Sequence, residues 1–407
     1  MQTVASIDLG TTKFCLAVLR KNQQGKPTID TLCIPAEGMT QGMLGHFETT
    51  SNALRRLITL GQEHYGFRLQ HVVTGVAGEH LKSRIVKENI RIKKHIIDSL
   101  LISELSQKVE TECREEGREI LHVIPLSYRI DGRAEVVDPT GFSGHSLAAT
   151  FFIIDADYLY LADIVRLFNS VGLSVRRLYA EPFASATVTL TEEEKELGVV
   201  LADIGGGTTD GVVFVRGMPC HLFSLNIAGL SATHDIASAL RLPIEQAERA
   251  KLTFGLSVLN TRQGLDVCDI HGRSGTLTWK DVYPILAARV KELGIMLREA
   301  SSLGPNLQAG LRLTGGGSAV IGIAPYLSNI LQVPVKPASP TIFPVEFDFR
   351  TCGDTSDLPN ILGAKYATVL GLVNLELTRI EDIQRARQHR LPSRYLSRFS
   401  NWLKDMV

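Results

Sequence analysis

The sequence lacks an excess of charge of either sign and lacks clustered cysteines. Its 407 residues contain 43 Lys and Arg against 43 Asp and Glu, a balance that disfavours general binding to nucleic acid. The six cysteines are scattered without a CxxC pair, which predicts reduced, structural thiols of the cytosolic kind. The first residues lead directly into an apolar segment, so we expect no signal peptide.

Long apolar runs are also missing. The longest uncharged stretch covers residues 313–335 and contains four glycines, so it predicts a turn and buried elements rather than a membrane span. The composition is 44% hydrophobic and 21% charged, as is usual for a folded soluble protein. At this length we expect two lobes or more.

The most informative stretch is the segment DIGGGTTD at residues 203–210. Apolar residues on both sides predict two strands joined by a turn, whereas a Walker A loop or a dinucleotide-binding turn leads into a helix. Three glycines let backbone N–H groups approach an anion. A phosphate would be repelled by the flanking aspartates unless Mg²⁺ lay between them. Taken alone, the segment is also compatible with an ordinary glycine-rich hairpin.

The same pattern occurs at the N-terminus. The segment SIDLGTTK at residues 6–13 again places an apolar strand, an aspartate, a glycine and two threonines before another strand. Asp8 and Asp203 are separated by nearly half the chain, which predicts two similar halves facing each other across a cleft. A third cluster, LTGGGS at 313–318, ends a short strand and opens a predicted helix over 319–331, a place that suits a phosphate or a ribose.

In this order, the three motifs resemble those of the actin, Hsp70 and sugar-kinase superfamily of ATP-binding proteins. Within it the chain is similar to the FtsA family of bacterial cell-division proteins over nearly all of its length. The closer resemblance is carried by ILHVIP at 120–125, YRIDG at 128–132, DPTGFSG at 138–144, TEEEKELG at 191–198 and the tail around residues 402–404. The first two segments resemble the small subdomain that FtsA proteins carry in place of the usual actin insertion.

The resemblance implies an α/β, actin-like two-lobed ATPase fold with an FtsA-type inserted subdomain and a C-terminal amphipathic helix. We expect the first lobe at 1–82, 163–201 and 355–373, the inserted subdomain at 83–162, the second lobe at 202–228 and 305–354, a nucleoside- and partner-binding subdomain at 229–304, a flexible linker at 374–391 and a membrane-targeting helix at 392–407.

The resemblance also implies which residues bind ATP. Asp8 and Asp203 are expected to hold hydrated Mg²⁺. The phosphates are expected to contact Gly10, Thr11, Thr12, Lys13, Gly205, Gly206, Gly207, Thr208 and Thr209. The nucleoside is expected to contact Gly229, Glu248, Lys251, Gly315, Gly316, Gly317 and Ser318. The family usually has two glycines where this chain has Ala228 and Gly229.

Three carboxylates are the candidates for hydrolysis, namely Glu181, Asp203 and Asp210. Glu181 would orient water for attack on the γ-phosphate, and we expect slow, regulatory turnover. Alternatives remain open for two of the predicted residues. Glu181 would equally suit the first turn of a helix beside a proline, and Glu248 with Lys251 would otherwise form a surface ion pair.

The predicted helix over 281–301 carries Arg289, Lys291 and Arg298. By resemblance it belongs to the subdomain that receives the C-terminal peptide of the tubulin-like protein FtsZ, and a basic groove suits an acidic, apolar peptide. The alternative is a solvated helix face. The resemblance further implies self-association into filaments and contacts between the inserted subdomain and later division proteins.

The tail has a different character. Residues 379–407 hold seven basic and three acidic side chains, and the part before Pro392 is polar and predicts a linker. After it, a helix would place on one face the apolar side chains Tyr395, Leu396, Phe399, Trp402, Leu403 and Met406. Such a helix, flanked by basic residues, suits an anionic membrane surface. The alternative is a helix docked on the protein's own core.

These observations predict an ATP-binding scaffold that polymerises and tethers FtsZ filaments to the cytoplasmic face of the cell membrane at the division site. One weak helix per copy would need several copies for stable attachment. A pilus-assembly relative of the same fold and a small-molecule kinase are the alternatives. The kinase would need a catalytic base in its substrate-recognition insert, and the inserted segment offers none.

Overall fold

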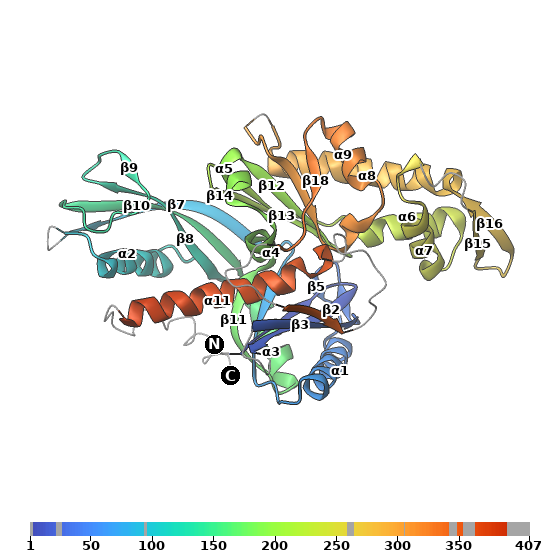
Figure 1. The fold of residues 1–407 in the computed structure, drawn as a ribbon, viewed down its shortest axis with the longest axis horizontal. Coiled ribbons are helices and arrows are strands. Elements are labelled where there is room, and N and C mark those ends of the chain that lie inside the picture. Colours follow the sequence, from blue (N-terminus) through green and yellow to red (C-terminus); the bar gives the residue numbers. More distant parts are fainter. Residues whose placement is uncertain are drawn as a thin grey trace.

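The structure is a computed structural model that describes residues 3–21, 27–92, 96–258, 264–304, 306–341, 348–352 and 363–388. Two sheets occupy the middle of the molecule, and a smaller subdomain projects at each end of its long axis (Figure 1).

The first sheet combines an antiparallel meander with parallel strands. Its six strands have the order β11-β6-β1-β2-β3-β19. Strands β1, β2 and β3 are antiparallel, whereas β6 and β11 run parallel to β1. The bounds are Val4–Leu9 (β1), Lys13–Lys21 (β2), Pro27–Pro35 (β3), His71–Val76 (β6), Ser174–Ala180 (β11) and Asp348–Cys352 (β19).

The second sheet repeats this construction. Its order, β14-β13-β12-β17-β18, matches β3-β2-β1-β6-β11 of the first sheet strand for strand, with the same antiparallel meander and parallel continuation. The bounds are Val199–Ile204 (β12), Thr209–Val215 (β13), Met218–Leu225 (β14), Gly310–Thr314 (β17) and Val335–Pro337 (β18). The predicted two similar halves are therefore confirmed.

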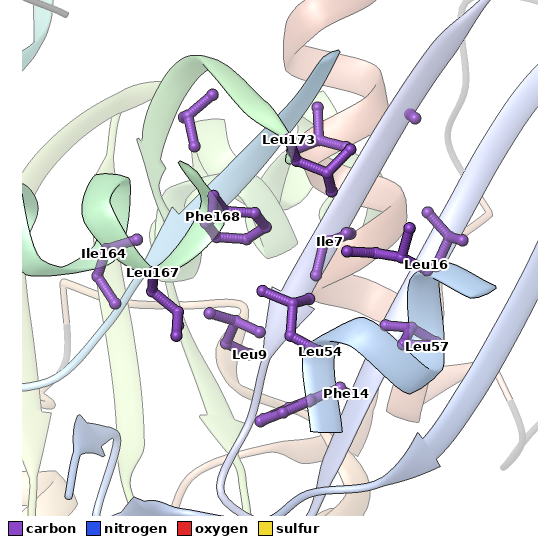
Figure 2. Close-up of a cluster of buried hydrophobic side chains, with 14 of the residues drawn as sticks. Ile7, Leu9, Phe14, Leu16, Leu54, Leu57, Ile164, Leu167, Phe168 and Leu173 are labelled. Atoms are coloured by element: carbon purple, nitrogen blue, oxygen red, sulfur yellow. The ribbon is translucent and has the colours of Figure 1, made fainter. Parts of the chain in front are cut away.

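Alternating side chains of β1 and β2 supply two separate cores. Ile7, Phe14 and Leu16 pack with α1 (Phe47–Tyr65) and α3 (Tyr158–Ser170) on one face of the sheet (Figure 2). Cys15, Ala17 and Leu19 pack with α11 (Ala367–Gln388) on the other. Because both faces are covered, two thirds of the positions in these strands are apolar, without strict alternation. Burying each large side chain stabilises the lobe by about 2 kcal/mol.

The subdomain at one end is a sheet with the order β7-β10-β8-β9, covered by α2 (Figure 1). Its elements are Leu81–Arg91 (β7), Ser99–Glu112 (α2), Arg118–Ile130 (β8), Glu135–Val136 (β9) and Ser146–Asp157 (β10). We call residues 78–157 the inserted subdomain, because the chain enters it from β6 and leaves it into α3 of the first lobe.

The subdomain at the other end packs three helices against a hairpin. Its elements are Gly229–Leu240 (α6), Ile244–Phe254 (α7), Gly264–Cys268 (β15), Ser274–Thr278 (β16) and Trp279–Ser301 (α8). The remaining elements are Met39–Thr40 (β4), Met43–Leu44 (β5), Glu181–Thr189 (α4), Glu192–Leu197 (α5), Gly316–Ala319 (η2), Ile323–Leu331 (α9) and Ala364–Tyr366 (η3).

Two local predictions differ from the structure. The linker expected over 374–391 is wrong as far as residue 388, because α11 continues to Gln388. Glu376 and Leu377 are buried, and Glu376 pairs with Arg379 one turn later, so tertiary contacts hold this polar stretch helical. The helix expected over 319–331 is divided into the 3₁₀ turn η2 and helix α9, separated by Gly322 in a left-handed conformation (φ 83°).

The expectation of reduced cysteines is wrong for one pair. Cys15 on β2 and Cys33 on β3 lie directly opposite each other, with their Cα atoms 4.2 Å apart, and form a disulfide. Only the register of the two strands brings them together, so no sequence spacing indicates it. The thiols of Cys113, Cys220 and Cys268 are free.

Candidate functional site

A cavity of about 630 Å³ lies between the two lobes, and residues from both hairpins and from α7 line it. It brings together the residues predicted from three separate motifs. The predicted site residues that line it are Asp8, Gly10, Thr11, Thr12, Lys13, Glu181, Asp203, Gly205, Gly206, Gly207, Thr208, Asp210, Gly229, Glu248, Lys251, Gly315, Gly316 and Gly317.

The tips of the two hairpins are in direct contact. A Cβ atom on Gly206 would lie 2.3 Å from Cγ2 of Thr12, and one on Gly207 would lie 2.6 Å from Oγ1 of Thr11. Real Cβ atoms do not approach other atoms this closely, so only glycine lets the two turns meet. The glycines therefore bring the two lobes into contact beside the cavity as well as exposing backbone N–H groups.

The third glycine turn, at residues 315–317, packs against the second hairpin. Gly315 has a φ of 83°, and a Cβ atom there would lie 2.2 Å from Oδ1 of Asp203. A Cβ atom on Gly316 would meet nothing within 4 Å. Gly315 thus allows the close approach to Asp203, and Gly316 leaves open space beside the cavity that it lines.

Two predicted residues do not line the cavity. The Thr209 hydroxyl is buried and donates to the carbonyl oxygen of Ile227 at 2.6 Å. The Ser318 hydroxyl donates to the carbonyl oxygen of Gly315 at 2.7 Å. Both side chains therefore shape the turns from outside rather than facing the space where a ligand would lie.

Asp8 and Asp203 end equivalent strands of the two sheets. Burial raises the pKa of Asp8, and the nearby Lys13 ammonium opposes this, at 4.0 Å from Oδ2. Burial also raises the pKa of Asp203 to about 6, against hydrogen bonds from Ser185 and Thr368 that lower it. Without a cation, each carboxylate is therefore poorly compensated.

Glu181 and Asp210 complete a group of four acidic residues. Burial raises the pKa of Glu181 well above its usual range, and the charges of Asp8, Asp210 and Asp203 raise it further. Asp210 is held by its neighbours, since it accepts from the Thr208 hydroxyl at 2.7 Å and from the Gly78 N–H at 2.9 Å. Carboxylates that raise the pKa of a neighbouring carboxyl in a cleft, as these do for Glu181, are typical of functional sites.

The residues present fit a phosphate group with a hydrated divalent cation. The glycine turns supply space and backbone donors, Lys13 supplies a positive charge, and Asp8 with Asp203 supplies negative charge. Within the described ranges, no three His, Cys, Asp or Glu side chains converge to hold a metal alone. Water and phosphate oxygens would have to complete the shell, as Mg²⁺ prefers.

Glu181 is placed by two features of the first lobe. It is the first residue of α4, where its carboxylate suits the positive end of the helix. Its Cγ atom also lies against Gly75 of β6, where an added Cβ would come within 2.3 Å. The side chain also lines the cavity. A place in the first turn of a helix and a place at the candidate site are therefore compatible for Glu181.

Glu248 and Lys251 both line the cavity and form an ion pair, 2.7 Å apart, as in the alternative to nucleoside binding, but the pair is not a surface one. Lys251 is buried, and its Nζ also donates to the Gly229 carbonyl at 3.0 Å and to Thr233 at 2.9 Å. Two of its three hydrogen bonds thus tie α7 to the start of α6, and the third stays within α7. Ala228 has an extended backbone (φ −160°), so the absence of a glycine there causes no strain.

The short hairpin β4–β5 also contributes to the site, although no motif of the sequence analysis points to it. The Gly42 N–H donates to Thr11 Oγ1 at 3.0 Å, and the Gly42 carbonyl accepts from the Tyr160 hydroxyl at 3.0 Å. Gly42 and Tyr160 both line the cavity. The close succession of Gly38, Gly42 and Gly45 was the available signal, since the first two have positive φ.

The three basic residues expected to bind a partner peptide lie on α8, and two of them are engaged within the chain. Arg289 donates to both carboxylate oxygens of Asp235 and to Glu292, and these bonds raise its pKa. Arg298 donates to the Leu331 carbonyl at 2.6 Å, at the end of α9. Lys291 is exposed.

The predicted membrane residues Tyr395, Leu396, Phe399, Trp402 and Leu403 lie outside the described residues. Among the helices that are described, none has the length and apolar character needed to cross a bilayer.

Comparison with known protein families identifies two matches. The family "Cell division protein FtsA" matches residues 200–371, and the family "SHS2 domain inserted in FTSA" matches residues 78–155. Together they cover more than half of the chain, and the second coincides with the inserted subdomain.

Curated proteins similar to the chain are cell division proteins FtsA. The protein from Neisseria meningitidis serogroup B is 28% identical over 380 residues, which is 91% of this chain and 89% of the relative. The protein from Pseudomonas aeruginosa is 28% identical over 387 residues (93% and 90%), and that from Bacillus subtilis is 28% identical over 348 residues (82% and 78%).

Solved structures of low identity share the fold. A chain of the PilM–PilN type IV pilus biogenesis complex has a TM-score of 0.60 at 19% identity, covering 91% of this chain and 97% of its own. MreB5 of Spiroplasma citri bound to ADP has a TM-score of 0.57 at 14% identity, covering 94% and 99%. The α/β, actin-like fold expected from the motifs is thus confirmed.

Proposed function

Because the chain belongs to the FtsA family of cell division proteins, we propose that it is an ATP-binding scaffold that polymerises and tethers FtsZ filaments to the cytoplasmic membrane at the division site. The observation that carries the ATP-binding part is the cavity where two equivalent hairpins meet tip to tip beside four acidic side chains.

The nucleotide would lie along this cavity. The hairpin turns at 10–13 and 205–208 would bind the phosphates, and the turn at 315–317 with Glu248 would bind the nucleoside. Mg²⁺, held through water by Asp8 and Asp203, would neutralise phosphate oxygens. Its charge would also return the raised pKa values of these two carboxylates toward their usual range.

Glu181 is the residue that we propose to act in hydrolysis. Its carboxylate faces the cavity from the start of α4, in the group that also contains Asp203 and Asp210. Once the cation lowers its pKa, the ionised group can accept a hydrogen bond from water and orient it. Asp210 is occupied by Thr208 and Gly78, so its role is to hold the second hairpin in place.

The partner contacts are proposed from the family. The inserted subdomain would contact neighbouring copies and later division proteins, and the α6–α8 subdomain would receive the FtsZ C-terminal peptide. Arg289 and Arg298 are engaged within the chain, so Lys291 is the predicted basic residue best placed to meet an acidic peptide. Residues 392–407 would lie flat in an anionic membrane surface.

Co-sedimentation with anionic liposomes in the presence of ATP tests the tether. The full chain is compared with a chain that ends at Leu391, and we expect only the full chain to pellet. If both pellet equally, or if neither does, the tail is not the anchor and the tether proposal fails.

A matched pair of full-length variants removes the effect of truncation. Trp402→Glu places a charge on the apolar face of the predicted helix and should abolish pelleting. Ser397→Glu adds the same charge on the opposite side of the predicted helix and should reduce pelleting much less, because electrostatic repulsion contributes only about 1 kcal/mol per charge.

A pilus-type scaffold is the second candidate, since the PilM–PilN complex shares the fold over nearly the whole chain. The two functions differ in the peptide that is bound. Fluorescence anisotropy with an FtsZ C-terminal peptide and with a PilN peptide would separate them: tight binding of the FtsZ peptide alone supports division, and the reverse supports pilus assembly.

A further inference from the structure

One buried side chain of the inserted subdomain contacts the start of α4. His122 lies on β8, and its ring centroid is 5.6 Å from that of Tyr179 and 5.2 Å from that of Phe183. Its Nε2 atom accepts a hydrogen bond of 3.0 Å from the N–H of Ala180. Ala180 immediately precedes Glu181.

This hydrogen bond links the inserted subdomain to a junction that otherwise packs against α11 and β6. Strand β11, which ends at Ala180, is the edge strand of the first sheet. Ala180 is also the N-cap of α4, and it offers no side chain to cap the helix. Its N–H is buried, and leaving such a donor unpaired costs about 1–3 kcal/mol. His122 therefore occupies the place that a further strand would take.

The imidazole acts as a fixed acceptor. Because Nε2 accepts from an N–H, the ring proton must be on Nδ1 in the neutral ring. Burial, together with the nearby charge of Arg177, lowers the pKa of His122 to about 3. The ring thus stays neutral throughout the physiological range and does not act as a pH sensor.

We propose that His122 is a positioning residue for ATP hydrolysis, through which the inserted subdomain holds the β11–α4 junction and therefore the Glu181 carboxylate. The inference rests on the hydrolytic role proposed above for Glu181. The position leaves little slack, because the Glu181 side chain already lies against Gly75. A displacement of about 1 Å at a reacting group can lower a rate by about 10²-fold.

The inserted subdomain is also fixed to the second lobe. The Ser83 hydroxyl accepts from the Leu222 N–H at 3.0 Å, and Glu79 accepts from the Asn226 amide at 2.6 Å. Phe152 of this subdomain shares a core with α4 and β12. Because the subdomain contacts both lobes, a second protein molecule that binds and displaces it would move Glu181 through His122. We therefore expect contacts at this subdomain to alter the rate of hydrolysis.

Three variants of the full chain test the proposal. His122→Leu removes the acceptor and keeps apolar bulk, whereas His122→Gln keeps an acceptor close to the position of Nε2. His145→Leu is the matched control, since His145 lies on the same subdomain with an exposed side chain. The measurements are single-turnover ATP hydrolysis, ADP affinity, and hydrogen–deuterium exchange of the peptide covering the start of α4.

We expect His122→Leu to slow single-turnover hydrolysis about tenfold or more and to change ADP affinity less than about twofold. Exchange at the start of α4 should rise in the same variant. His122→Gln should recover most of the rate and the protection, and His145→Leu should match the unmodified chain. A side chain with only a general structural role would instead weaken ADP binding and hydrolysis together.

The two proposals fail in different ways. If Glu181→Gln hydrolyses ATP as fast as the unmodified chain, or the unmodified chain shows no hydrolysis, the role of Glu181 fails. If instead His122→Leu leaves exchange at α4 unchanged, or slows hydrolysis no more than His145→Leu, the positioning role of His122 is overturned. Equal loss in His122→Leu and His122→Gln also overturns it, because the acceptor would then not be the cause.

Discussion

Ser185 on α4 of the first lobe donates a hydrogen bond of 2.7 Å to Oδ2 of Asp203, on β12 of the second lobe. Thr368, at the start of α11, donates to the same oxygen at 3.1 Å. The symmetry of the two hairpins does not indicate this bond, which ties a carboxylate of the second lobe to two hydroxyls of the first. It makes the ionisation of Asp203 depend on how the lobes are placed.

We predict that Ser185→Ala weakens Mg²⁺-dependent nucleotide binding. Loss of a hydrogen bond to a buried carboxylate costs about 1.5–3 kcal/mol, and the pKa of Asp203 should rise above its present value of about 6. Titration with ADP in Mg²⁺ and in EDTA should show a loss of affinity about tenfold or more in Mg²⁺. Thr187→Ala, on the same helix with a hydroxyl that bonds only locally, should leave both titrations unchanged.

Gly75→Ala should slow hydrolysis while ADP binding persists. The added methyl group would come within 2.3 Å of Cγ of Glu181, so that the carboxylate must move or the strand must shift, at a cost of about 1–3 kcal/mol. Gly275→Ala is the control, since a Cβ there meets nothing within 4 Å. A hydrolysis rate equal in the two variants would contradict the assigned position of Glu181.

The parts of this site that the sequence predicts are those encoded by short local motifs. Strand, aspartate, glycine turn and threonines specify each hairpin within about eight residues, and their repetition indicates two facing lobes. The contacts between motifs follow from tertiary packing. Gly75 and Tyr160, which line the cavity, and Ser185, which bonds Asp203, lie in ordinary helix and strand segments, so their roles are visible only in the folded chain.

Contacts after residue 374 and on α8 escape the sequence for the same reason. A polar composition after residue 374 indicates a linker, but Leu377 and the buried Glu376 dock α11 onto the first sheet. Arg289 and Arg298 look available on a helix face, but their partners, Asp235 and the end of α9, come from other elements. In each case the local pattern does not reveal a tertiary contact with residues that are distant in the sequence.

Asp203→Asn should stabilise the nucleotide-free protein at neutral pH. The pKa of Asp203 is raised from 3.8 to about 6 in the folded state, so its contribution to stability is fully present below pH 4 and is lost as the pH rises through 6. Asparagine carries no charge to bury. We expect the free energy of unfolding of the variant to exceed that of the unmodified chain by ~1–2 kcal/mol at pH 7.5 and to equal it near pH 4.

Urea unfolding at both pH values measures this difference. With saturating Mg²⁺ and ADP at pH 7.5, the unmodified chain should become the more stable of the two. The bound cation then compensates the charge of Asp203, whereas it has little affinity for the amide of the variant. An unchanged order in Mg²⁺ and ADP would contradict the assignment of Asp203 to the cation.

Lys251 and Glu248 should separate into a structural and a ligand-binding role. Lys251→Met removes two hydrogen bonds from α7 to α6 and one within α7, to Glu248, so we expect a loss of about 2–4 kcal/mol in stability without nucleotide. Glu248→Gln keeps the bonds from Lys251 to Gly229 and Thr233 but leaves the buried ammonium without its counter-ion, so we expect a smaller loss of stability. If Glu248 accepts from the ribose, however, Glu248→Gln should lose most of the preference for ADP over 2′-deoxy-ADP. Thermal unfolding measures the structural role, and titrations with ADP and with 2′-deoxy-ADP measure the ligand-binding role. If Glu248→Gln retains the preference for ADP, the pair has a structural role alone.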